Sequence, residues 1–294
     1  MKKLTLLSIF LLTNACGSLG SLMPSEKFDE ETLASLEGPD VTTVQGGLLS
    51  EAKKAEQKDD YVTALQYYKE LVSKDENNLN YQYRFAENLR KIGQNEVALK
   101  IYDKLLAKDY GNLDYKESKA LALMGMTEFT KAGALFTDIM NTDPVRWRSI
   151  NGAGLIFAMD GKYAEANEYF ELAKDVKPYE SSIYNNQGMA KALTGNYGEA
   201  ISLLKKASEY AVARSHKKRH IDLNLALVNG IAGNSDVAKK IATPHLSEAQ
   251  LYNNLGFYSY LAKDKQLARA YLNKALTTSQ VHYQKAWDNL DNVN

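Results

Sequence analysis

One pattern recurs at intervals of 34 residues along most of this sequence. An alanine marks each copy, and a large apolar residue follows the alanine four positions later. The alanines are Ala64, Ala98, Ala132, Ala166 and Ala200, and the residues that follow them are Tyr68, Tyr102, Phe136, Phe170 and Leu204. A spacing of four places both residues on one face of a helix. A repeat of this length indicates stacked helical units, and we expect these residues to form their core.

The most regular copies lie within residues 147–214, where each of several signature residues recurs after 34 positions. These residues are Gly154 and Gly188, Tyr163 and Tyr197, and Ala173 and Ala207. This order of glycine, aromatic residue and alanine resembles the tetratricopeptide repeat (TPR), a helix-turn-helix unit. The resemblance implies an all-α fold, a right-handed α-solenoid. The alanine spacing predicts five repeats, at residues 45–78, 79–112, 113–146, 147–180 and 181–214.

The spacing slips after residue 214 and then recovers. Ala200 and Ala238 are 38 residues apart, whereas Ala238 and Ala268 are 30 apart. We place the excess at residues 215–220 and the deficit near Pro244, because proline shortens a helix. Two further repeats are expected, at 219–248 and 249–282, which makes about seven within a solenoid at 45–294. A final helix at 281–294 is expected to cap it, with Tyr283, Trp287 and Leu290 against the last repeat.

The pattern of the N-terminal residues indicates a targeting segment rather than part of the fold. Lys2 and Lys3 precede an apolar run at residues 4–12, which has the length of a secretory signal and is too short to span a bilayer. Cys16 is the only cysteine, and its position resembles a bacterial lipobox. This resemblance implies a lipoprotein signal peptide at 1–15 and acylation of Cys16. The alternative is an ordinary signal peptide that is cleaved after Ala15.

Residues 16–44 contain six acidic residues and a single base. Such a composition cannot bury enough apolar surface to fold alone, which predicts a flexible acidic linker. Gly17 follows the cysteine where an aspartate would indicate retention at the inner membrane. By this resemblance we expect a lipid-anchored protein of the bacterial cell envelope, in the outer membrane and facing the periplasm.

No stretch of the sequence has the spacing of a catalytic motif. Its 36 basic and 36 acidic residues give no net charge, which argues against nucleic acid as a partner. His216 and His220 lie four positions apart but lack a third ligand. We therefore expect no enzymatic activity, no cofactor and no metal.

The strongest local charge is a basic patch of Arg214, Lys217, Lys218 and Arg219. It is either a solvated turn or a site for an acidic partner or a lipid headgroup.

The first helices of stacked TPR units line a concave groove, which typically takes an extended peptide or a partner helix. Counting from each repeat start gives the groove candidates, which are Tyr83, Glu117, Asn151, Leu155, Asn185, Met189, Leu227, Asn253 and Phe257. An asparagine side chain both donates and accepts, so it can pair with any peptide backbone. The alternative is that asparagines here belong to the consensus of the repeat itself.

A more specific resemblance lies in the two irregular repeats. The runs at 224–228, 231–233 and 254–258 are similar to the C-terminal part of the TPR lipoprotein of tight-adherence (Tad, Flp) pilus assembly systems. The resemblance implies a protein-binding scaffold that helps a secretin or other components of the pilus or secretion machine to assemble. The alternative is a TPR lipoprotein that docks peptidoglycan enzymes or outer-membrane assembly factors.

Overall fold

The computed structural model describes residues 44–293, which form α-helices joined by short turns. These residues divide into two compact units, of which the first ends at Pro178 and the second begins at Tyr179. The predicted signal peptide, Cys16 and the acidic linker up to residue 43 lie outside the described residues. None of the described helices is both long enough and apolar enough to cross a membrane.

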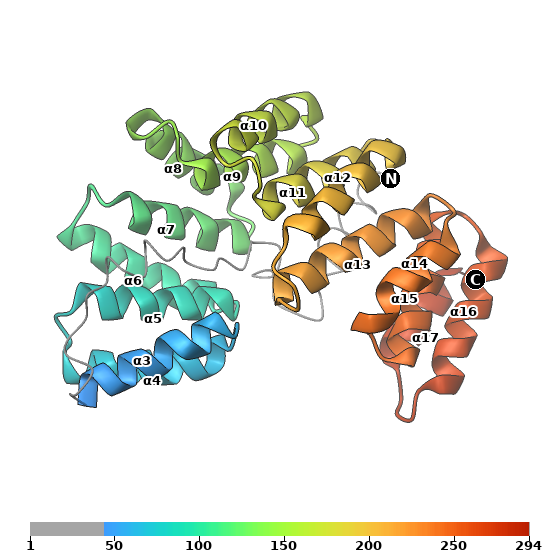
Figure 1. Cartoon of the computed structure of the whole chain (residues 1–294), viewed down its shortest axis with the longest axis horizontal. Coiled ribbons are helices and arrows are strands. Elements are labelled where there is room, and N and C mark those ends of the chain that lie inside the picture. Colours follow the sequence, from blue (N-terminus) through green and yellow to red (C-terminus); the bar gives the residue numbers. More distant parts are fainter. Residues whose placement is uncertain (1–43, 294) are drawn as a thin grey trace. The chain divides into compact units, whose positions relative to one another are not determined.

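The first unit contains four helical hairpins, each packed on the next (Figure 1). They are α3 (Val44–Gln57) with α4 (Tyr61–Lys74), α5 (Leu79–Lys91) with α6 (Asn95–Lys108), α7 (Leu113–Gly125) with α8 (Phe129–Thr142), and α9 (Trp147–Met159) with α10 (Tyr163–Val176). Each hairpin coincides with one of the first four predicted repeats, except that α3 begins one residue earlier, at Val44. The expectation of an all-α repeat fold is confirmed.

The second unit contains three hairpins and a final helix. They are α11 (Ser181–Leu193) with α12 (Tyr197–Tyr210), α13 (His216–Ile231) with α14 (Ser235–Ala242), α15 (Glu248–Leu261) with α16 (Lys265–Thr278), and then α17 (Gln284–Val293). The irregular spacing has a direct counterpart here. Helix α13 has 16 residues against 13 in α11, and α14 has 8 residues against 14 in α12. Pro244 lies in the 3-10 turn η2 (Thr243–His245) that follows the shortened helix.

The repeated alanines and the residues four positions later form the buried core, as predicted. Each of the five alanines is 0% exposed, and the five residues that follow them are 0–1% exposed. The two helices of a hairpin approach closely at this level. A Cβ added at Gly188 in α11 would lie 2.9 Å from Cγ of Leu204 in α12. Small residues are therefore needed here because the helices would otherwise be forced apart.

The turn within each hairpin contains a residue with positive φ. Glycine holds this position in four hairpins, with φ of 77° to 88° at Gly93, Gly161, Gly195 and Gly233. The other three hairpins use Asp59, Thr127 and Lys263, with φ of 58° to 69°. A left-handed residue ends a helix and reverses the chain, and glycine adopts this conformation without a steric penalty.

The final helix α17 packs with a different face from the one predicted. Ala286 and Val293 are 0% exposed, and Leu290 packs against the core of α16. Trp287 is 46% exposed, and Tyr283 precedes the helix. The prediction that Trp287 covers the last repeat is wrong, because residues 286, 290 and 293 share the buried face and residue 287 lies roughly 100° around the helix from residue 286.

Candidate interaction surfaces

In the first unit, the predicted groove residues contact neighbouring repeats. The hydroxyl of Tyr83 lies 3.0 Å from Oγ of Ser118, and its ring packs 5.1 Å from that of Tyr115. The carboxylate of Glu117 accepts a 2.6 Å hydrogen bond from Ser149 Oγ. Tyr83 is half-buried, whereas three candidates are buried at 4–5% exposure, namely Glu117, Asn151 and Leu155. Tyr83 and Glu117 therefore connect the first helix of one repeat to the first helix of the next.

The same holds for the candidates in the second unit. Asn185 Oδ1 accepts a 2.9 Å hydrogen bond from Asn224 Nδ2 in the following repeat. Asn253 Oδ1 accepts one of 2.9 Å from Asn289 Nδ2 of the final helix. Asn185 and Phe257 are half-buried, and three candidates are buried, namely Met189, Leu227 and Asn253. Contact of the candidates in either unit with a peptide stays a prediction, whereas Asn185 and Asn253 each join their repeat to the helix that packs next to it.

A buried charge cluster in the second repeat has no counterpart in the sequence-based predictions. Arg90 donates to both carboxylate oxygens of Glu87, at 3.0 Å from Nε and 2.7 Å from Nη2. The hydroxyl of Tyr102 donates to the same carboxylate. Glu87 and Arg90 are 4% and 2% exposed. Burial acts to raise the pKa of Glu87, but the Arg90 guanidinium outweighs it and holds that pKa well below its ordinary value.

A second cluster links the first two repeats. Arg84 forms an ion pair with Glu56, and Asn88 Nδ2 donates to the same carboxylate at 2.7 Å. Arg84 is 2% exposed. Buried ion pairs of this kind depend on both partners, because removing one leaves an uncompensated charge in a medium that solvates it poorly. The polar groups in the interior of the first unit therefore serve its packing.

The predicted basic patch at the start of α13 is only partly available to a ligand. Lys217 Nζ lies 3.0 Å from Glu180 Oε1, and Lys218 Nζ lies 3.1 Å from Asp222 Oδ1. Arg214 and Arg219 are exposed. Two of the four positive charges are thus matched by carboxylates of the same unit, which weakens the patch as a site for an anionic partner.

The histidines are placed apart from any metal-binding arrangement. His245 is not isolated, since its Nε2 lies 3.0 Å from Asp222 Oδ2. Burial, reinforced by the charges of Arg219 and His216, lowers the pKa of His220. Among residues 44–293, no group of three or more histidine, cysteine, aspartate or glutamate side chains is arranged to hold a metal ion.

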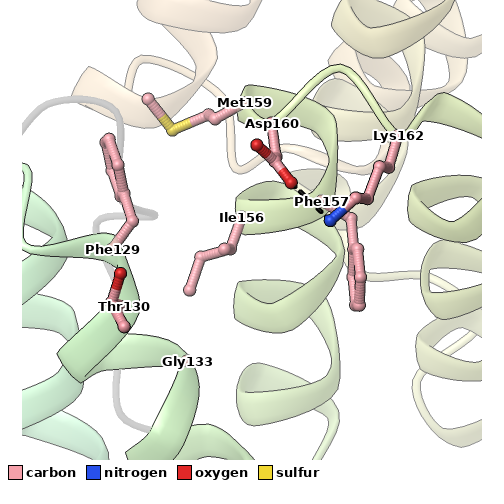
Figure 2. A pocket seen from close by; sticks show the side chains of 8 residues that line it. All are labelled: Phe129, Thr130, Gly133, Ile156, Phe157, Met159, Asp160 and Lys162. Atoms are coloured by element: carbon pink, nitrogen blue, oxygen red, sulfur yellow. Dashed lines mark ion pairs between the residues drawn. The ribbon is translucent and has the colours of Figure 1, made fainter.

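A surface cleft of about 410 Å³ lies between α8 and the C-terminal end of α9. Figure 2 shows Phe129 and Thr130 of α8 on one side of it and Ile156 of α9 on the other. Phe157 and Met159 complete its apolar lining. An exposed ion pair of 2.5 Å between Asp160 and Lys162 borders it. The cleft was not among the sequence-based predictions.

The helical hairpins, their alanine core and their left-handed turns define a tetratricopeptide repeat fold. Three solved structures share it. A TPR protein from Parabacteroides merdae aligns with a TM-score of 0.57 at 18% identity, over 85% of this chain and 98% of that one. A thermophilic TPR protein from Thermus thermophilus aligns with 0.55 at 16% identity, over 62% and 99%. PilF of Pseudomonas aeruginosa aligns with 0.52 at 15% identity, over 73% and 97%.

These identities are low enough that the likeness establishes the fold alone. Neither a protein-family model nor a curated protein matches the chain.

Proposed function

We propose that this protein is a non-enzymatic scaffold that binds other proteins of the bacterial envelope and assists the assembly of a Flp/Tad-type pilus or secretion machine. The observation that carries the scaffold role is the repeat fold, with four hairpins in one unit and three in the other. Stacked hairpins present extended surfaces to partners. The pilus role rests on the resemblance at residues 224–258, and the likeness to PilF adds only the shared fold.

The proposal includes a lipid anchor at Cys16, which would hold the protein at the outer membrane with the repeats in the periplasm. Each acyl chain contributes about 0.8 kcal/mol per buried CH2, so two or three chains hold a protein stably. A Cys16→Ser variant should incorporate no labelled palmitate and should leave the membrane fraction. A variant that fractionates with the membrane like the wild type would contradict the anchor.

Affinity capture tests the partner class. The tagged full chain is expressed in its native host, the envelope is solubilised in mild detergent, and captured proteins are identified by mass spectrometry. Recovery of a secretin or another pilus component is expected. Recovery of peptidoglycan enzymes or outer-membrane assembly factors, with no pilus component, would replace the pilus role by the alternative scaffold role.

A further inference from the structure

The cleft between α8 and α9 exists because one repeat lacks a side chain that the others have. The position directly after each core alanine carries Leu65, Leu99, Gly133, Asn167 and Ile201 in the five regular repeats. Only the third repeat has glycine there, and Gly133 lines the cleft. The leucines and the isoleucine are half-buried at this level. The absent side chain leaves apolar surface of α9 uncovered.

Neither the backbone nor the packing requires a glycine at residue 133. It lies inside α8, so its backbone is helical. A Cβ added to it would meet Cδ1 of Ile156 at 3.7 Å, which is an ordinary contact. Glycine in a helix is less stable than alanine by roughly 0.5–1 kcal/mol. This residue therefore weakens its own helix, and what it provides is the open cleft.

The cleft combines apolar side chains with polar ones, and part of its apolar wall is held in place. The ring of Phe157 is stacked on Tyr169, with centroids 5.1 Å apart. Phe129 and Ile156 come from two helices that the hairpin packing fixes. Met159 is the adaptable member, because an unbranched thioether can fit differently shaped apolar groups. The volume of about 410 Å³ is near the lower end of ligand pockets, which run from roughly 300 to 1,000 Å³.

The charges beside the cleft are matched in pairs. Asp160 and Lys162 pair across 2.5 Å on the α9 side, and Glu128 and Lys131 pair across 3.1 Å at the start of α8. All four side chains are substantially exposed, at 45–68%. A charged ligand would have to compete with these pairs, whereas a neutral apolar group would leave them intact. An apolar pocket within a polar rim is the usual seat of a partner's anchoring side chain.

We propose that this cleft binds one bulky neutral side chain, of the leucine, methionine or phenylalanine class, from a segment of a partner protein. The inference rests on the proposed scaffold function and adds a specific contact to it. The paired charges favour a neutral anchor over a charged one. Gly133 sets the specificity, because a leucine side chain there would occupy space that the glycine leaves open in the cleft.

The test uses the full chain with 13C-labelled methyl groups of isoleucine and methionine. Capped tripeptides Gly-Phe-Gly, Gly-Leu-Gly and Gly-Asp-Gly are titrated against it, and the methyl signals of Ile156 and Met159 are followed by NMR. The phenylalanine and leucine peptides should shift both signals saturably, and the aspartate peptide should not. Gly133→Leu should weaken this binding by about tenfold or more.

Gly198→Leu is the matched control. A Cβ at Gly198, also within a helix, would meet no heavy atom of the described chain within 4 Å. The Gly198→Leu variant should have the same circular dichroism spectrum and the same peptide affinity as the wild type. Equal peptide binding by the wild type and Gly133→Leu would overturn the inference, as would an absence of shifts. Tighter binding of decanoate than of every peptide, or shifts caused by self-association without peptide, would also overturn it.

Affinity capture separates this inference from the function on which it rests. Loss of the captured partners in Gly133→Leu, but not in Gly198→Leu, supports both. Equal capture by both variants leaves the scaffold function standing and rejects the cleft as the contact. Specific peptide binding without any captured envelope protein supports the cleft and rejects the scaffold function.

Discussion

Replacing the buried charge cluster of the second repeat by the residues of the third should leave the fold intact. The cluster consists of Glu87, Arg90 and Tyr102. Thirty-four residues later, the same positions hold Leu121, Met124 and Phe136, which are 7%, 3% and 0% exposed. The chain therefore contains its own apolar version of this packing. The triple variant Glu87→Leu, Arg90→Met, Tyr102→Phe copies that version into the second repeat.

The single variants and the triple variant should differ in their free energy of unfolding. Tyr102→Phe removes one hydrogen bond to a carboxylate that keeps both contacts with Arg90, which should cost about 1.5 kcal/mol, the lower end for bonds to charged groups. Arg90→Met removes the guanidinium that donates two hydrogen bonds to Glu87, and a buried charge that loses its partner costs about 3–5 kcal/mol. In the triple variant no charge of the cluster remains. Its stability should lie near that of the wild type or exceed it by about 1–4 kcal/mol.

Urea unfolding followed by circular dichroism measures these differences. The decisive comparison is between Arg90→Met and the triple variant, which should regain at least about 3 kcal/mol of the lost stability. The pH dependence of the free energy of unfolding provides a second test. Because the pKa of Glu87 is lowered on folding, its contribution is complete above the unfolded value of about 4.3 and is lost as the pH falls towards the folded value. Lowering the pH should therefore reduce the stability of the wild type more than that of the triple variant. A triple variant no more stable than Arg90→Met would refute this account.

Two further substitutions test the packing and the charge pairing. Gly152→Ala should destabilise the protein by about 1–3 kcal/mol in thermal unfolding, because its Cβ would lie 2.5 Å from Cζ of the buried Phe136 ring; Gly133→Ala serves as the control and should not destabilise. Lys217→Met should cost about 1.5 kcal/mol at pH 7. Burial acts to raise the pKa of Glu180, but the charge of Lys217 and the hydrogen bonds from Ser182 and Lys217 together lower it. The loss should therefore shrink as the pH falls below about 4; a loss that is constant with pH would contradict this.

The regular part of the fold could be predicted because its steric demands are local and repeated. A residue where two helices nearly touch must be small in every hairpin, and this leaves a visible period in the sequence. The change in alanine spacing after residue 214 could also be predicted, since Pro244 marks the shortened helix. The buried face of the final helix could not be predicted in this way, because that helix has no second copy in the sequence with which to compare it.

The charged side chains could not be assigned from sequence because their partners are distant along the chain. Lys217 and Lys218 read as members of a basic run, but Glu180 lies 37 residues before Lys217. Glu87 stands where the next three repeats have leucine or methionine, which was a usable signal. Arg90 follows Glu87 by three residues, and Tyr102 holds the core position of the second helix. The sequence alone does not show that these three side chains meet, because the folded hairpin brings them together.

Glu87 and Gly133 each stand where two other repeats of the first unit have a leucine. The depth of each position in the fold decides what the change does. At position 87 the side chain is enclosed, so an acid there must find its own cation and hydroxyl within the fold. At position 133 the site opens to solvent, so the loss of a side chain creates a concave apolar surface rather than a sealed void. A sealed void would only destabilise the protein, whereas an open one can be filled by a partner. The departure at Gly133 is therefore the one through which this solenoid can distinguish among the proteins it meets.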